Sequence, residues 1–238
     1  MQAIILAGGK GTRLKPYTTV FPKPLVPIGD SPIMEIIIRQ LSGFGVRRIT
    51  ISTGHLAELI ESYFGDGSRW NVAIEYVRET VPLSTAGALK LVENCDDDFL
   101  VMNGDILTGL DFRALFEHHR RMNVMATVAT YVRDTKIDFG IVESNEDHLL
   151  VGYREKPTYT FRVSMGVYVL NRRCKDLIGN GEALGMPDLL LRIIRSGQKV
   201  FCYESTAYWL DIGRVDDYER AQEEFENNKK TLLATDGL

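Results

Sequence analysis

Apolar and polar residues follow one regular pattern over the first half of the chain. Short apolar runs bounded by turn residues alternate with longer segments in which apolar side chains recur every three or four residues. The runs predict strands at Gln2–Leu6, Arg48–Thr53, Val72–Val77 and Phe99–Met102, and the longer segments predict helices at Ile33–Phe44, Leu56–Phe64 and Thr85–Val92. Strands and helices in alternation predict a Rossmann-like α/β fold with a mainly parallel sheet and right-handed crossovers.

The pattern changes after Asp111, where strand-like segments separated by polar turns predominate. Strands are predicted at Thr127–Val132, Ile141–Glu143, Leu149–Arg154, Val163–Leu170, Val200–Glu204 and Ala207–Leu210, and helices at Phe112–Met122, Pro187–Arg195 and Val215–Asn227. The second half is thus expected to add antiparallel strands to the sheet. Because no linker or low-complexity tract interrupts the chain, we expect a single domain over residues 1–238, with halves of about 1–110 and 111–238.

Composition narrows the class of protein. The chain has 238 residues, 45% of them hydrophobic and 25% charged, as in ordinary globular proteins. A net charge of −4 predicts no general attraction to nucleic acid or to an anionic membrane. The sequence has neither a signal-peptide pattern at its start nor an apolar run of about 18 residues, and its three cysteines lack CxxC spacing. These features predict a cytoplasmic protein with reduced thiols.

A glycine-rich segment, Gly8–Gly11, follows the first predicted strand. Glycines let the backbone approach a ligand and turn its N–H groups towards an anion, and ligands bind at this edge of open α/β sheets. The segment is not a P-loop, because Gly9-Lys10 is followed by Gly11, and Leu14 stands where a dinucleotide fingerprint needs glycine. The prolines that follow are expected to keep the chain extended to about Pro32. A tight glycine turn without a ligand remains the alternative.

Lys23 stands between Pro22 and Pro24, which stiffen the backbone on both sides. Such a lysine is suited to a preorganised contact with phosphate. Considered alone, it is equally compatible with a surface lysine in a proline-rich loop.

These two features together carry a resemblance. Gly8-Gly9-Lys10-Gly11-Thr12-Arg13-Leu14-Lys15-Pro16-x-Thr18, followed by Pro22-Lys23-Pro24, resembles the signature of the sugar nucleotidyltransferases, and later motifs extend the likeness over essentially the whole chain. The resemblance implies transfer of a nucleoside monophosphate from a triphosphate to a sugar 1-phosphate, with release of pyrophosphate. It implies that Arg13 engages the phosphates and that Lys23 stabilises transition-state charge. The implied nucleotide contacts are Leu6, Ala7, Gly8, Gly9, Gly11, Thr12, Arg13, Thr85, Gly87, Asn103 and Gly104.

Two acidic residues are candidates for a metal site. Asp105 follows a predicted strand, and Asp211 lies in Trp209-Leu210-Asp211-Ile212-Gly213. Taken alone, Asp105 fits a solvated turn and Asp211 fits a helix N-cap. The resemblance implies instead that both chelate one Mg²⁺, a cation that prefers oxygen ligands. The four histidines have no zinc-ligand spacing.

The sugar side of the site is implied by two further motifs. Arg154-Glu155-Lys156-Pro157 resembles an element in which the glutamate holds sugar hydroxyls and the lysine neutralises the sugar phosphate, together with Lys23. Gly140 matches a backbone contact to the sugar. A solvated charge pair is the alternative for Glu155 and Lys156. The segment Leu83-Ser84-Thr85-Ala86-Gly87 resembles a loop of the same family in which glycine stands at the position of Ser84. The serine removes a residue suited to positive φ.

The motifs around Asp105 and Asp211 look most like those of mannose- and heptose-1-phosphate guanylyltransferases, which indicates GTP and a hexose or heptose 1-phosphate. Use of dTTP, UTP or CTP with glucose 1-phosphate is the alternative within the family. From other classes, a glycosyltransferase would need an aspartate where Asn103 stands, and a non-catalytic sensor would not need Arg13, Lys23 and both aspartates. The sequence ends at Leu238 without hexapeptide repeats, so we expect any homodimer to form through the catalytic domain.

Overall fold

The computed structural model describes residues 1–233, with only the backbone for positions 230 and 231. Its centre is a seven-stranded sheet in the order β12-β8-β11-β6-β1-β4-β5. All of these strands run in one direction except β11, which is antiparallel to β6 and β8. The strands are β1 (Gln2–Ala7), β4 (Arg48–Thr53), β5 (Ala73–Arg78), β6 (Asp98–Asn103), β8 (Ala126–Lys136), β11 (Thr158–Asn171) and β12 (Val200–Ser205). The predicted α/β fold with a mainly parallel mixed sheet is confirmed.

Helices cover both faces of this sheet because neighbouring strand residues point in opposite directions. Ile5 faces a core formed with α1, α2, α4 and α6, whereas Ile4 faces a second core formed with α3 and α5. The helices are α1 (Ile33–Gly43), α2 (Ala57–Phe64), α3 (Ser84–Gly87), α4 (Phe112–Met122), α5 (Met186–Arg195) and α6 (Val215–Leu233). Among residues 1–233, no helix is both long and apolar enough to span a membrane.

The proline-rich segment differs from expectation. Instead of staying extended to Pro32, the chain makes three 3₁₀ turns, at Thr12–Leu14, Tyr17–Thr19 and Lys23–Leu25, and then the short hairpin of β2 (Pro27–Ile28) and β3 (Ser31–Pro32). The prediction was wrong because the φ that proline fixes, near −65°, also suits a 3₁₀ turn.

Two short strands place the acidic motifs. β7 (Ile106–Thr108), which the sequence pattern did not reveal, pairs antiparallel with β13 (Trp209–Asp211). In this register Asp211 lies opposite Ile106, the residue after Asp105. A ladder of three residue pairs therefore joins segments about a hundred positions apart.

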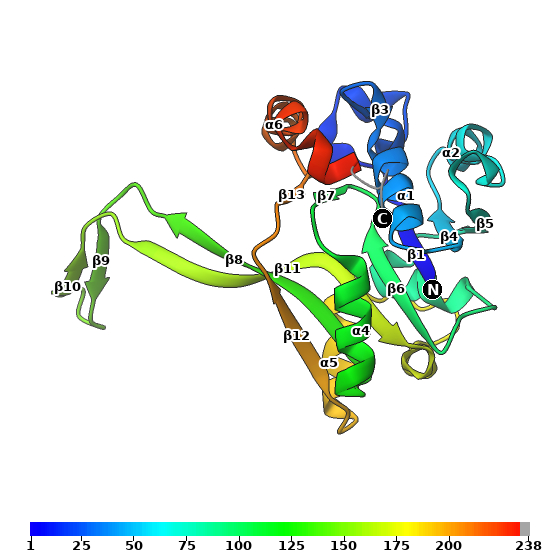
Figure 1. Cartoon of the computed structure of the whole chain (residues 1–238). Helices are drawn as coiled ribbons and strands as arrows, with labels where there is room; N and C mark the ends of the chain where they lie inside the picture. The colour runs from blue at the N-terminus through cyan, green and yellow to red at the C-terminus, as the bar shows by residue number, and fades with distance from the viewer. Residues whose placement is uncertain (234–238) are drawn as a thin grey trace.

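A long two-stranded ribbon leaves the body of the protein. β8 and β11 continue as a pair beyond the central sheet and lead to a hairpin of β9 (Ile141–Ser144) and β10 (Leu150–Arg154). Figure 1 shows the ribbon projecting to one side, with β9 and β10 at its far end. We call residues 132–163 the arm. The predicted strands here were shorter, ending at Val132 and beginning at Val163.

Candidate active site

The glycine-rich loop is shaped by close backbone contacts. Gly11 has φ +61°, and its carbonyl accepts a hydrogen bond of 2.8 Å from the Thr18 hydroxyl. A Cβ on Gly54 would lie 2.7 Å from the Gly8 carbonyl oxygen, so the ends of β1 and β4 touch directly. Side chains at these glycines would force the loop away from β4.

Lys23 is held inside the site rather than on the surface. Its side chain is 10% exposed and forms an ion pair with Asp105, which is 25% exposed. A buried cation is tolerated when a carboxylate compensates it, and the pair fixes the direction of the ammonium group. The interpretation of Lys23 as a free surface lysine is therefore excluded.

Asp105 and Asp211 lie side by side at the β7–β13 ladder. The Ile212 N–H donates to the Asp105 carbonyl oxygen at 3.0 Å, which joins the two aspartate segments. One carboxylate oxygen of Asp105 pairs with Lys23, while the other, Oδ1, is buried and has no hydrogen-bond partner in the protein. An unsatisfied carboxylate oxygen beside a second carboxylate is a suitable ligand for a hard cation.

The electrostatics of Asp211 are consistent with this proximity. Desolvation by neighbouring groups raises the pKa of the Asp211 carboxyl, and the Asp105 carboxylate raises it further. Lys23 and Arg13 act in the opposite direction, although they do not cancel the rise. Close carboxylates repel one another, and a cation between them would relieve the repulsion.

Arg13 reaches the same place from the glycine-rich loop. A Cβ added to Gly213 would lie 3.5 Å from Asp211 Oδ2 and 3.7 Å from Arg13 Nη1. Gly213 thus leaves room for a guanidinium group beside the carboxylates. The four residues with implied catalytic roles, Arg13, Lys23, Asp105 and Asp211, gather at one end of the sheet.

Arg13, Lys23 and Asp105 line a pocket of about 380 Å³ at the carboxyl ends of the parallel strands, whereas Asp211 lies beside Asp105 and is not among the lining residues. The pocket lining includes most of the residues implied to bind nucleotide, namely Leu6, Ala7, Gly8, Gly9, Gly11, Thr12, Arg13, Thr85, Asn103 and Gly104, together with Lys23 and Asp105. Gly87 is not among the lining residues. It is buried in packing, because a Cβ there would lie 2.2 Å from the Glu182 carbonyl oxygen.

Apart from Lys23, the residues implied to bind the sugar phosphate come together away from the pocket. Gly140, Glu155 and Lys156 all lie on the arm, and none of them lines the pocket. A Cβ on Gly140 would lie 2.0 Å from the Tyr153 hydroxyl, which donates to Glu155 Oε2 at 3.1 Å. Lys156 Nζ lies 3.8 Å from Glu155 Oε1. These four residues, which we call the arm cluster, form one polar group on the arm.

Five lining residues are not among the predicted site residues, namely Pro24, Glu79, Pro82, Ser84 and Gly213, and Glu79 is the most informative of them. Glu79 directly follows β5, and its carboxylate accepts from the Ser52 hydroxyl and the Leu83 N–H, both at 2.9 Å. Because parallel strands end at one edge of the sheet, the rule that selected Asp105 also selects Glu79. Gly213 lies within the Asp211 motif, but no functional role was predicted for it.

Ser84 is another of these five residues. It lines the pocket and has φ +61°. The serine has therefore kept the left-handed backbone that the usual glycine would adopt, at a conformational cost of about 1–2 kcal/mol.

The fold and the site together define an α/β protein with a phosphate-type glycine loop, two cations and two carboxylates around one pocket. The nucleotidyl transferase family model matches residues 2–228, and the chain belongs to this family. The resemblance noted from the motifs is confirmed.

Individual relatives differ in their nucleotide. The chain is 33% identical to a UTP--glucose-1-phosphate uridylyltransferase of Synechocystis sp., over 93% of this chain and 62% of that protein. It is 31% identical to a D-glycero-alpha-D-manno-heptose 1-phosphate guanylyltransferase of Aneurinibacillus thermoaerophilus, over 95% of this chain and 99% of that protein. The crystal structure of HddC from Yersinia pseudotuberculosis complexed with GMP-PN has a TM-score of 0.72 and 25% identity, over 94% and 99% of the two chains. The chain thus spans less than two thirds of the first relative and nearly all of the other two.

Proposed function

We propose that this protein transfers a nucleoside monophosphate from GTP to a hexose or heptose 1-phosphate, releasing pyrophosphate. The observation that carries the proposal is the pocket that Arg13, Lys23 and Asp105 line together with the glycine-rich loop, with the Asp211 carboxylate next to these three groups. Opposite charges so arranged suit a triphosphate with a bound cation better than any uncharged ligand.

The reaction needs no side-chain nucleophile. A phosphate oxygen of the sugar 1-phosphate forms a new bond to the α-phosphorus of the triphosphate. The bond between that phosphorus and the oxygen that bridges it to the β-phosphorus breaks, and pyrophosphate leaves. Two anions must approach each other, so positioning and charge compensation limit the rate. Loop N–H groups orient the triphosphate, while Arg13 and Lys23 offset charge at the reacting oxygens.

Asp105 and Asp211 are proposed to hold Mg²⁺. Within residues 1–233, no three His, Cys, Asp or Glu side chains gather into a metal-binding group. A two-carboxylate site suits Mg²⁺, because this ion usually takes one or two protein ligands and completes its shell with water and phosphate oxygens. When bound, the ion would polarise the α-phosphate.

Glu79 supports guanine as the base. A carboxylate accepts two hydrogen bonds side by side, and guanine presents two adjacent donors, N1–H and the N2 amino group. Uracil and thymine present a single donor between two carbonyl acceptors, which would face the carboxylate unfavourably. The position of Glu79 on the pocket wall makes this contact available.

The test is a matrix of GTP, UTP, dTTP, CTP and ATP against mannose, glucose and heptose 1-phosphates, with Mg²⁺ and with pyrophosphate release as the readout. The expected result is pyrophosphate only when both substrates are present, fastest with GTP. A glycosyltransferase or a sensor would release none with any pair, and that result would refute the proposal.

A further inference from the structure

The arm is built as an extension of the sheet. β8 and β11 stay in register without a break from Thr130↔Ser164 to Lys136↔Thr158, and the Ile137 N–H donates to the Pro157 carbonyl oxygen at 3.0 Å. Arg162 also bonds Glu204 of β12 at 2.6 Å, which fixes the base of the ribbon to the body. Beyond the register shift between Ser164 and Tyr168, the paired strands therefore continue outward and away from the body (Figure 1).

The arm is unusually apolar for a structure surrounded by water. Eight of its large apolar side chains are 43–78% exposed, namely Val132, Phe139, Val142, Leu149, Leu150, Val151, Tyr153 and Phe161. At the β9–β10 hairpin the register shifts between Leu150 and Gly152, and the neighbouring apolar side chains of Leu149, Leu150 and Val151 are 63–65% exposed there. An isolated two-stranded hairpin is marginally stable in water, and apolar exposure on this scale marks a contact surface.

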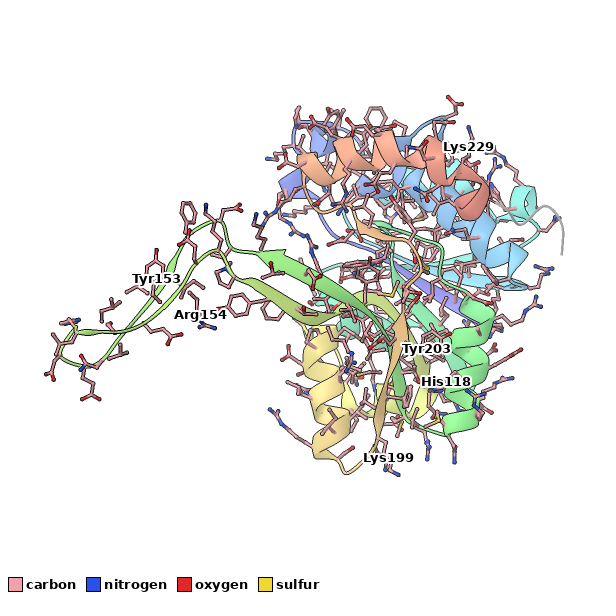
Figure 2. All side chains as sticks on the ribbon, turned by 60° about the vertical axis from the view of Figure 1, so that its left-hand side comes forward. His118, Tyr153, Arg154, Lys199, Tyr203 and Lys229 are labelled. Carbon is pink, nitrogen blue, oxygen red and sulfur yellow. The ribbon has the colours of Figure 1, made fainter. Side chains whose placement is uncertain are left out.

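The arm also carries the arm cluster, which is assembled but remote from the pocket. Figure 2 shows Tyr153 and Arg154 on the far part of the arm, well away from the body. The side chains of Glu155 and Lys156 are 60% and 58% exposed. None of the pocket's lining residues comes from residues 132–163, so the pocket of one chain lacks these groups.

The rim of the pocket offers a matching apolar surface. Val20 and Phe21, 65% and 56% exposed, directly precede the pocket segment that contains Lys23. Val81, 57% exposed, lies next to Pro82 on the pocket wall. An apolar arm that carries polar sugar-binding groups would cover these rim residues while it delivers the groups to the pocket.

We propose that two copies of this chain exchange arms, so that the arm cluster of each copy completes the sugar-phosphate half of the other copy's pocket. The inference rests on the proposed function. Exchange of identical elements about a two-fold axis gives a closed dimer in which each arm is covered. Return of the arm to its own pocket would require the ribbon to turn back, either at the register shift between Ser164 and Tyr168 or beyond the Lys136↔Thr158 pair, whereas the ribbon projects away from the body (Figure 1).

The test uses heterodimers purified through two different affinity tags after co-expression. One chain carries Asp211→Asn in the body, and its partner carries Glu155→Ala with Lys156→Ala on the arm. With exchanged arms, one site per dimer combines an intact body with an intact arm, so pyrophosphate release is expected at about half the wild-type rate per dimer. The two homodimers are expected to show little activity.

The matched control places all three substitutions in one chain and pairs it with a wild-type chain. Exchanged arms leave this heterodimer nearly inactive, because each site has one damaged part. An arm that serves its own chain gives the opposite pattern, with half activity in the control and almost none in the first heterodimer. That pattern, an active monomer, or full activity of the arm variant would each overturn the inference.

Sedimentation separates this inference from the proposed function. Leu150→Asp on the arm is expected to convert dimer to monomer, whereas Ile194→Asp, equally apolar and exposed at 53% on α5, is expected to leave the dimer intact. If the wild-type chain releases no pyrophosphate with any substrate pair, the proposed function fails and sedimentation still reports on the arm. If it turns over but complementation fails, only the arm inference is lost.

Discussion

Asp105 and Asp211 are two like charges in close proximity, which folding alone would disfavour. Asp105 is partly compensated by Lys23, whereas Asp211 has a raised pKa that reports an unfavourable environment for its charge. Such local conflict in a well-packed protein is typical of sites where a ligand or a reaction supplies the missing compensation.

Removal of the Asp211 charge should therefore lower turnover without unfolding the protein. We expect Asp211→Asn to reduce kcat by roughly 10² or more, on the scale of losing a key electrostatic group. Asp216→Asn, which removes a nearby exposed carboxylate from the first turn of α6, should leave kcat nearly unchanged. Pyrophosphate release and thermal unfolding of both variants provide the comparison, and equal turnover would rule out the proposed role.

The Glu79 carboxylate should determine which nucleotide base the protein prefers. We expect Glu79→Gln to lower kcat/KM for GTP by about tenfold or more and to raise the relative preference for UTP, because a bidentate base contact gives about 1–3 kcal/mol of discrimination. Glutamine still accepts the Leu83 N–H, so the loop remains supported. Glu75→Gln, exposed on the same strand, is the control. An unchanged ratio of kcat/KM for the two nucleotides would exclude Glu79 from base recognition.

Among the elements, those with strong periodicity could be predicted closely, and α4 was predicted residue for residue at Phe112–Met122. Its apolar positions recur at helical spacing, and Asp111 caps its first turn by accepting from the Ala114 N–H at 2.9 Å. The strand β7 has only three residues, too few for a period to appear. The pairing that unites the two aspartates was therefore not readable from local pattern.

The packing of α4 predicts a pH effect on stability. His119 on α4 is 2% exposed, and burial lowers the pKa of its imidazole, although the Asp98 carboxylate acts in the opposite direction. Below about pH 6.5 the unfolded chain then binds a proton that the folded chain resists, so stability is complete above this pH and falls below it. The slope cannot exceed about 1.4 kcal/mol per pH unit for one group.

Urea unfolding at pH 7.5 and pH 5.5 measures this effect. His119→Gln should reduce the loss of stability between the two conditions, whatever its effect at either one. His148→Gln, an exposed position on the arm, should keep the wild-type difference. Identical differences for wild type and His119→Gln would contradict the assignment.

Across the whole molecule, the sequence indicated candidate residues for the chemistry but not how far apart they would lie. Parallel strands end at one edge, which explains why residues after β1 and β6 could be placed together, and the same rule would have added Glu79 after β5. Glu155 and Lys156 belong to an antiparallel ribbon whose length depends on pairing between β8 and β11. Polar and apolar residues mix along the arm without a regular period, so its reach was underestimated.

The projecting ribbon has a consequence for how catalysis responds to dilution. If each pocket uses the arm cluster of the partner chain, a monomer retains its fold and its nucleotide contacts but lacks the sugar-phosphate contacts that the arm supplies. By mass action, the rate per chain should then fall as enzyme is diluted below the dissociation constant of the pair, whereas an autonomous enzyme keeps a constant rate per chain. A structural extension that is neither buried nor close to the chemistry would make activity depend on the abundance of the protein itself.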